Sequence, residues 1–131
     1  MRGPGSDAAP TYVIVAEEAA HWGIPAQLVA RVVEPTEWRG APPLDVGRLL
    51  AAGPRAAGRR RILVLAEAGR ERPLWTAGPI LSRPVAAQRI CALPPLVAAR
   101  VTPGIVGVMF DEDGPPVLLL DAWRLGATPG V

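Results

Sequence analysis

Residues 102–125 read TPGIVGVMFDEDGPPVLLLDAWRL, and this stretch decides the fold class. Two apolar runs, residues 105–110 and 117–120, flank a turn cluster that ends in Gly114, whose tolerance of a positive φ suits a tight turn. Asp121 follows the second run directly, where its carboxylate can accept hydrogen bonds from the backbone N–H groups of the next turn. The stretch therefore predicts a β-hairpin that ends in a short helical stop.

A shorter copy of this ending lies in the first half of the chain. Residues 44–50, LDVGRLL, repeat the order of apolar residue, Asp, two spacers, Arg and Leu that residues 120–125 show, and both copies follow a Pro-Pro pair. A repeated strand-to-helix ending indicates two related units. Residues 51–58, which contain Gly53-Pro54, are the best candidate for the boundary between these units.

Short apolar runs between turn signals predict the other strands. Prolines interrupt residues 85–101, so we expect that segment to be irregular, and we expect residues 79–84 at a sheet edge because proline cannot donate to a ladder. Frequent short strands favour an all-β fold over a helical or βαβ fold. The expected strands before the final hairpin are residues 12–16, 21–24, 62–66, 72–77 and 79–84, with turns at residues 17–20 and 67–71.

The composition of the 131 residues restricts the class of protein. Half of the residues are hydrophobic, which excludes wholesale disorder, and no apolar run approaches the roughly 20 residues that span a bilayer. Residues 1–10 lack the hydrophobic segment of a secretory signal, so we expect a cytoplasmic protein. A net charge of +2 gives little attraction to nucleic acid or anionic membranes.

Catalytic and metal chemistry have little support in the sequence. A nucleophilic site would need the single histidine, His21, beside Ser82 or the single cysteine, Cys91. His21 precedes Trp22 on an expected strand, where a structural histidine is the better interpretation, and Cys91 reads as a small buried hydrophobe. Residues 111–113 are acidic but lack the spacing of a calcium loop. We therefore expect no catalytic residue, no metal site and no cofactor.

The order of apolar strand, Gly-containing turn, VLLLD and short helix resembles the end of the CheW-like domain family. Residues 22–29, WGIPAQLV, are similar to the aromatic-Gly-Val/Ile segment of that family, and Gly107 takes the matching place on the hairpin strand. The resemblance covers about residues 12–125. It implies an all-β fold of two small SH3-like β-barrel subdomains within one domain.

The resemblance also implies the domain limits. The single CheW-like domain would span residues 11–125, with one subdomain at about residues 11–58 and the other at about residues 59–125. Outside it, we expect a disordered N-terminus at residues 1–10 and a flexible C-terminus at residues 126–131.

Two departures from the family pattern change the expectation for the first subdomain. The family carries a hairpin of the Arg-Gly-Val-x-Asn-Leu-Arg-Gly type before its first Asp-ended strand, whereas here Trp38-Arg39-Gly40 leads almost directly to Asp45. The first subdomain is therefore expected to be truncated. The family's Val-x-Glu segment corresponds to Val29-Ala30-Arg31, where the charge is reversed, and a charge mismatch across an interface can cost several kcal/mol.

The function that the resemblance implies is a non-catalytic adaptor in bacterial chemotaxis. Such an adaptor docks on the cytoplasmic tip of a chemoreceptor (a methyl-accepting protein) and binds a CheA-type histidine kinase; the reversed charge predicts that kinase binding is weakened or lost. The implied partner-binding valines, Val29, Val32 and Val33, could instead pack in the core. Trp38 could instead fill the gap left by the missing hairpin. A homodimer through the unpaired edge is a further alternative. The implied partner-binding residues are Val29, Arg31, Val32, Val33 and Trp38.

A small β-barrel that binds nucleic acid is the alternative function. Arg59-Arg60-Arg61 could contact phosphates, and single-stranded nucleic acids stack on aromatic side chains that basic residues surround. The four tryptophans are scattered along the chain and are not interleaved with basic residues, and we expect Trp75 and Trp123 to pack in the core of the second subdomain. The sequence therefore favours the adaptor, with no nucleic acid and no membrane insertion among its partners.

Overall fold

A computed structural model describes residues 9–18, 20–50, 60–98, 103–110 and 114–125. Short helical turns join the strands: η2 (Ala26–Leu28), η3 (Pro35–Glu37), α1 (Val46–Leu50), η4 (Ala87–Arg89) and α2 (Pro95–Ala98). The strands are β1 (Thr11–Ala16), β2 (His21–Pro25), β3 (Val29–Val33), β4 (Leu44–Asp45), β5 (Arg61–Glu67), β6 (Arg70–Thr76), β7 (Ile80–Pro84), β8 (Ile90–Ala92), β9 (Ile105–Met109) and β10 (Val117–Leu120).

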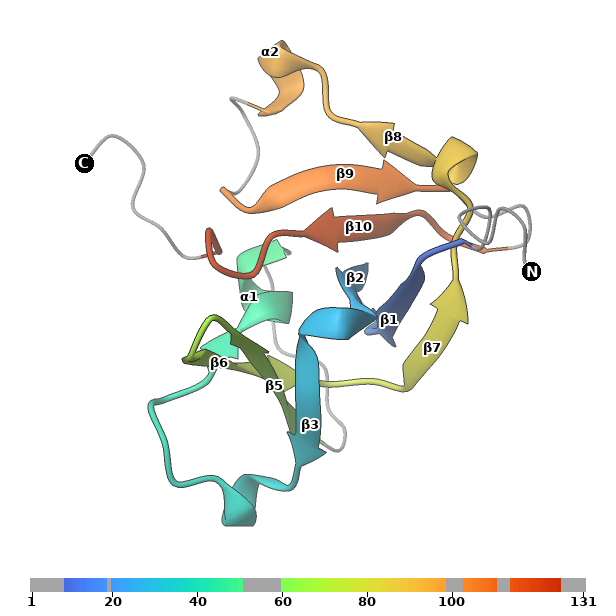
Figure 1. The fold of residues 1–131 in the computed structure, drawn as a ribbon. Helices are drawn as coiled ribbons and strands as arrows, with labels where there is room; N and C mark the ends of the chain where they lie inside the picture. Colours follow the sequence, from blue (N-terminus) through green and yellow to red (C-terminus); the bar gives the residue numbers. More distant parts are fainter. Residues whose placement is uncertain (1–8, 19, 51–59, 99–102, 111–113, 126–131) are drawn as a thin grey trace.

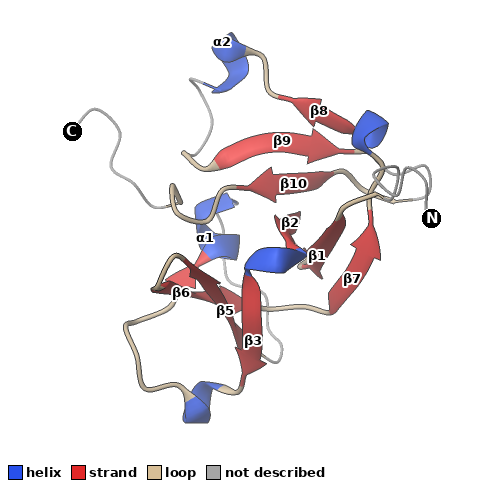
Figure 2. Ribbon diagram, in the orientation of Figure 1, coloured by secondary structure: helices blue, strands red, loops and turns tan. Residues whose placement is uncertain are grey.

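The strands form two sheets, so the all-β prediction is confirmed (Figures 1 and 2). The large sheet has the order β7-β1-β2-β10-β9-β8, and the small sheet has the order β3-β5-β6-β4. The hairpin predicted at the end of the chain is present as the antiparallel pair β9–β10. The expected edge segment is also present, as β7.

The two sheets repeat one pairing scheme. Each is built on a hairpin, β1–β2 or β5–β6, and the strand that follows each hairpin crosses to the other sheet, so that β3 pairs with β5 and β7 pairs with β1. The Asp-ended strands complete the scheme, since β10 pairs in parallel with β2 and β4 pairs in parallel with β6. The internal repeat of the sequence therefore corresponds to a repeat in strand pairing.

The repeat is incomplete in the small sheet, which agrees with the expected truncation. Beyond β10 the large sheet continues through β9 and β8, whereas β4 pairs only with β6 among the described strands. The connection from β7 to β10 occupies residues 85–116, while the connection from β3 to β4 occupies residues 34–43. The shorter connection leaves no room for a second hairpin strand.

Each sheet contains strands from both sides of the predicted subdomain boundary, because β3 and β7 each pair in the sheet opposite to the hairpin that precedes them. The boundary segment itself, residues 51–58, lies outside the described residues, as do residues 1–8 and 126–131. The subdomain limits and flexible ends therefore remain predictions. At the N-terminal end, the described part includes Pro10, whose carbonyl accepts a 2.9 Å hydrogen bond from the backbone N–H of Val85.

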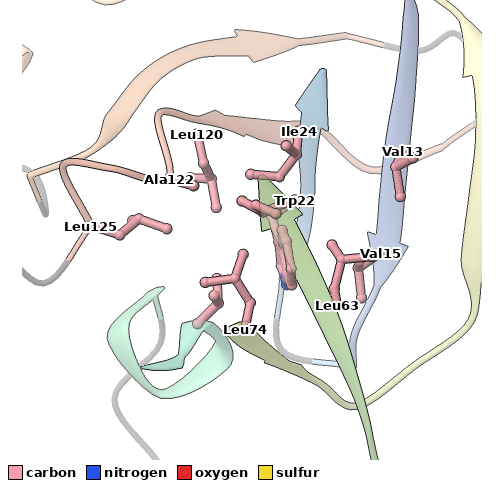
Figure 3. Close-up of a cluster of buried hydrophobic side chains, with 11 residues drawn as sticks. Val13, Val15, Trp22, Ile24, Leu63, Leu74, Leu120, Ala122 and Leu125 are labelled. Atoms are coloured by element: carbon pink, nitrogen blue, oxygen red, sulfur yellow. The ribbon is translucent and has the colours of Figure 1, made fainter. Parts of the chain in front are cut away.

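The main core lies between the two sheets. Residues of β1 alternate between faces, so that Val13 and Val15 point toward the small sheet and Ile14 points to the opposite side. A second cluster, around Ile14 and Met109, lies on that opposite side of the large sheet. Figure 3 shows the main cluster, which consists of Val13, Val15, Trp22, Ile24, Val46, Leu63, Leu65, Leu74, Leu120, Ala122 and Leu125.

One local prediction was wrong, and a second placed a turn correctly but gave it too many residues. Residues 85–101 were expected to be irregular, but Ile90–Ala92 forms β8 by pairing with β9. The prolines lie on either side of these three residues, so they do not prevent pairing with a strand that is distant in the sequence. The turn expected at residues 67–71 is tighter, since only Ala68 and Gly69 separate β5 from β6. Both have positive φ, 52° and 80°, as the twist of a two-residue hairpin turn requires.

Candidate partner-binding surface

The predicted partner-binding valines lie on β3, an edge strand of the small sheet. A β-bulge between Val29 and Arg31 changes which side of the sheet the strand presents. Val29 and Val32 lie opposite Leu65 and Leu63, and so share the face of the inter-sheet core. The bulge therefore separates the predicted residues into two sets.

The second set lies on the outer face of the small sheet. Arg31 and Val33 are opposite Val64 and Ile62, which are buried outside the two core clusters. Val29 packs against the inter-sheet core, as the core alternative expected, whereas Val32 is 39% exposed. The structure thus brings Arg31, Val33 and Trp38 toward one face and leaves Val32 accessible on the other.

Arg31 forms a surface ion pair that reaches two strands away. Its Nη1 lies 3.0 Å from Oε2 of Glu71 at the start of β6, and both side chains are about half exposed. Its guanidinium carbon also lies 5.9 Å from the ring centre of Trp38. Exposed pairs of this kind contribute at most about 1 kcal/mol to stability, so the charge of Arg31 matters more for recognition than for folding.

Trp38 is held by its own loop. The indole N–H donates a 2.7 Å hydrogen bond to the carbonyl of Ala41, and the ring covers Gly40 so closely that any Cβ there would overlap it. The side chain is half-buried. The loop therefore presents a fixed aromatic surface beside Arg31, and whether a partner uses that surface remains a prediction.

Trp75 and Trp123, which were expected in the core of the second subdomain, stack against arginine side chains instead. The guanidinium of Arg60 lies 4.1 Å from the ring centre of Trp75, and that of Arg70 lies 4.4 Å from the ring centre of Trp123. Both indoles are only half-buried. The core prediction was wrong because Trp75 follows the core residue Leu74, and successive residues of a strand point to opposite faces.

The same stacking bears on the nucleic-acid alternative. Arg60, the middle residue of the Arg59-Arg60-Arg61 run, is half-buried and its Nη2 lies 3.3 Å from Oδ2 of Asp45. Arg61 is half-buried as well, and Arg59 lies outside the described residues. The described part of the run is thus integrated into the small sheet instead of forming a free basic patch.

The two Asp-ended strands close in the same manner. The backbone N–H of Arg48 donates to Oδ1 of Asp45 at 3.2 Å, and that of Trp123 donates to Oδ1 of Asp121 at 3.0 Å. The predicted capping role of Asp121 is confirmed. These caps fix where each strand stops and each turn begins.

Glu17 is a buried residue that the sequence reading placed in a turn. It is 6% exposed, and its Oε2 accepts hydrogen bonds from Trp22 Nε1 at 2.9 Å and from the backbone N–H of Ala77 at 3.4 Å. Its Oε1 occupies the space that a Cβ at Gly47 would fill. The alternation of Val13, Val15 and Glu17 was the signal that could have placed this carboxylate on the core face.

Burial raises the pKa of Glu17 above its ordinary value of 4.5. The hydrogen bonds from Trp22 and Ala77 act in the opposite direction, the nearby charge of Asp45 raises the pKa further, and Arg60 lowers it. Glu17 therefore links β1, β2, the β6–β7 crossing and α1 at one point beside the inter-sheet core.

The residues considered for catalysis are far apart. His21, Ser82 and Cys91 lie on β2, β7 and β8; β1 separates the first two strands, and β10 and β9 separate β2 from β8. Ser82 lies opposite Val13 and Cys91 opposite Val108, on the face of Trp22, whereas His21 points to the other face, so His21 is beside neither of them. Cys91 is exposed, contrary to the buried position expected for it.

The described part of the chain shows neither a metal-binding cluster nor a membrane-spanning helix. The described residues contain no group of three or more His, Cys, Asp or Glu side chains that could hold a metal ion. Within the same ranges, no helix has the length and apolar character needed to cross a membrane.

Comparison with known proteins supports the fold. The chain matches no protein-family model, and no curated protein matches it in sequence. Its structure is similar to the crystal structure of the scaffolding protein TtCheW from Thermoanaerobacter tengcongensis, with a TM-score of 0.67 and 16% identity over 86% of this chain and 89% of that chain. The fold is CheW-like, as the sequence resemblance implied.

Proposed function

We propose that this protein is a non-catalytic chemosensory adaptor. The observation that carries the proposal is the CheW-like fold, shared with a scaffolding protein over most of both chains, together with a pairing scheme in which two Asp-ended strands close two related hairpins. Its partner would be the cytoplasmic tip of a chemoreceptor, a helical hairpin that can lay an apolar face against a protein surface.

The docking surface in this proposal is the exposed edge of β3, with Val32 on one face of that strand and, on the other face, Arg31 and Trp38 of the loop that follows. Val32 is 39% exposed on an edge strand, and Trp38 is a half-buried aromatic residue held by Ala41. Aromatic anchors surrounded by apolar contacts dominate binding energies at many interfaces. Val29 packs against the inter-sheet core on the face of Val32, and the half-buried Val33 lies on the outer face with Arg31.

Weak or absent binding to a CheA-type kinase is the second part of the proposal. Arg31 stands where the resembling family has an acidic residue, and it is engaged by Glu71 at 3.0 Å. The small sheet also lacks a strand beyond β4 among the described residues. The first feature changes the charge presented by β3, and the second shortens the opposite edge of the same sheet at β4.

Calorimetric titration tests both parts. The probes are the cytoplasmic hairpin of a chemoreceptor encoded in the same genome and the regulatory domain of its CheA-type kinase. We expect micromolar binding to the receptor hairpin, at least about tenfold weaker binding for Val32→Asp, and no loss for Leu81→Asp, a matched change at a 53% exposed position on β7. Absence of receptor binding would refute the adaptor; micromolar kinase binding would refute the second part alone.

A charge-swap variant isolates the role of Arg31. Arg31→Glu with Glu71→Arg keeps the ion pair and restores an acidic residue at the position that resembles the kinase contact. We expect this double variant to bind the kinase domain at least about tenfold more tightly than the unmodified protein. An unchanged affinity would show that the missing strand, and not Arg31, limits kinase binding.

A further inference from the structure

The outer edge of β8 differs from the other edges of the two sheets. Exposed edges are normally protected by proline or charged residues, and three of the four edges follow this rule among the described strands. β7 contains Arg83 and Pro84, and β3 contains Arg31. β4 contains Asp45 and begins directly after two prolines. β8 reads Ile90-Cys91-Ala92, with neither charge nor proline, and pairs only with β9 in the described structure.

Among the described residues, the sheet face beside this edge is apolar and largely exposed. Cys91 lies opposite Val108, so both share a face with Val106 and Phe110, two residues to either side on the β9 segment. Val106 is 43% exposed and Phe110 is 52% exposed. The small sheet covers this same face only at β10 and β2. There Leu118 packs against the inter-sheet core, and Trp22 is part of that core.

Exposed apolar side chains are concentrated at this end of the molecule. Figure 1 shows α2, β8 and β9 together at the end of the large sheet that lies away from the small sheet. Of the six large hydrophobic side chains that are exposed among the described residues, four belong to this region: Leu96, Val97, Val106 and Phe110. Large exposed apolar patches on soluble domains usually mark interaction sites.

We propose that β8 is the interface with a second copy of this chain. Two β8 strands would pair antiparallel around a twofold axis at Cys91, which joins the two large sheets and brings the two apolar patches together on one side. This register is self-complementary, because Cys91 faces its own copy and Ile90 faces the partner's Ala92 without any charge. The equivalent self-pairing of β3 around Arg31 would place two guanidinium groups opposite each other, which is unfavourable.

The edge created by the truncation is a poorer candidate. β4 has two residues, and Pro42 and Pro43 before it have no N–H to donate to an added strand. The proposed dimer therefore uses the complete sheet, at the end opposite to β7, and leaves β3 and Trp38 free for the partner of the proposed function. The dimer does not depend on that function.

Cys91 provides a direct test because it is the single cysteine of the chain. In an antiparallel pair, the Cα atoms of directly opposite residues are about 4.5–5.5 Å apart, so a short bis-maleimide should join two copies through Cys91. We expect a cross-linked dimer that depends on protein concentration and disappears in Cys91→Ser. Sedimentation of Cys91→Ser should still show the non-covalent dimer.

Two substitutions should break the dimer without touching the core. Cys91→Glu places like charges opposite each other, and Val106→Asp places a charge in the apolar patch; we expect each to weaken self-association at least about tenfold, with an unchanged circular dichroism spectrum. Val32→Asp, a change of the same kind on β3, is the matched control and should leave the dimer intact. A monomer at all micromolar concentrations, or a dimer that Val32→Asp abolishes and Val106→Asp does not, would overturn the proposal.

Discussion

The indole N–H of Trp22 donates a 2.9 Å hydrogen bond to the carboxylate of Glu17, and neither residue is more than 6% exposed. The pair sits where β1, β2 and the β6–β7 crossing meet, beside Gly47 of α1. A buried carboxylate is costly unless hydrogen bonds compensate its charge. This relationship makes the stability of the molecule depend on pH at one identifiable place.

Glu17→Gln should remove that pH dependence. Since the pKa of Glu17 is raised in the folded state, the folded protein binds a proton more tightly than the unfolded chain does. The stability contributed by this group is fully present below the ordinary pKa of 4.5 that applies in the unfolded chain and is lost as the pH rises through the folded pKa. Urea unfolding at a series of pH values should show Glu17→Gln gaining stability relative to the unmodified protein as the pH rises; parallel curves would contradict this account.

Trp22→Phe should be strongly destabilising at pH 8. The substitution removes the donor to Glu17 and shrinks a fully buried side chain, and together these effects should cost about 3 kcal/mol. Part of the loss should disappear in the Glu17→Gln background, because a neutral amide needs less compensation than a carboxylate. A double-mutant cycle by chemical denaturation measures this coupling, and a coupling energy near zero would show that the hydrogen bond contributes little.

Removal of the two strand-ending carboxylates should have unequal effects. Asp121→Ala loses a cap to the N–H of Trp123 and should cost about 1 kcal/mol. Asp45→Ala loses the cap to Arg48 and also the half-buried ion pair with Arg60, so its cost should be larger. The free energies of unfolding of the two variants provide the comparison; a larger loss for Asp121→Ala would be inconsistent with the capping geometry.

Gly78→Ala should destabilise the protein more than Gly69→Ala. A Cβ at Gly78 would overlap the carbonyl oxygen of Ala16, a backbone atom of β1 that cannot rotate away, and such overpacking costs about 1–3 kcal/mol. At Gly69 nothing lies within 4 Å of the added Cβ, and only the positive φ of 80° opposes alanine, at about 1 kcal/mol. Thermal unfolding of the two variants tests the ranking, and equal midpoints would contradict it.

Local patterns in the sequence were sufficient for most strands and for the two caps. The hairpin β9–β10 was predictable because a turn cluster separates two apolar runs, and the capping by Asp121 followed from its place directly after the second run. The truncation between β3 and β4 was expected because the sequence departs there from the pattern of the CheW-like family, and the short connection agrees with that expectation.

The candidate site was only partly predictable. The sequence identified Val32 and Trp38 as residues of interest, but the bulge at β3 that separates Val29 and Val32 from Arg31 and Val33 has no signature in one strand alone. The pairing of Arg31 with Glu71 joins residues 40 positions apart. Contacts of this kind depend on register between strands, which a single segment does not encode.

The sequence by itself determined the strand content, the repeated Asp-ended endings and the shortened connection, because these depend on residues that are neighbours in the chain. Only the tertiary structure decided that the hairpins exchange their following strands between two sheets, that Glu17 is buried and that β8 is exposed at an edge. Each of these outcomes depends on which distant strands pair and which face they cover, and that choice is made when the inter-sheet core forms.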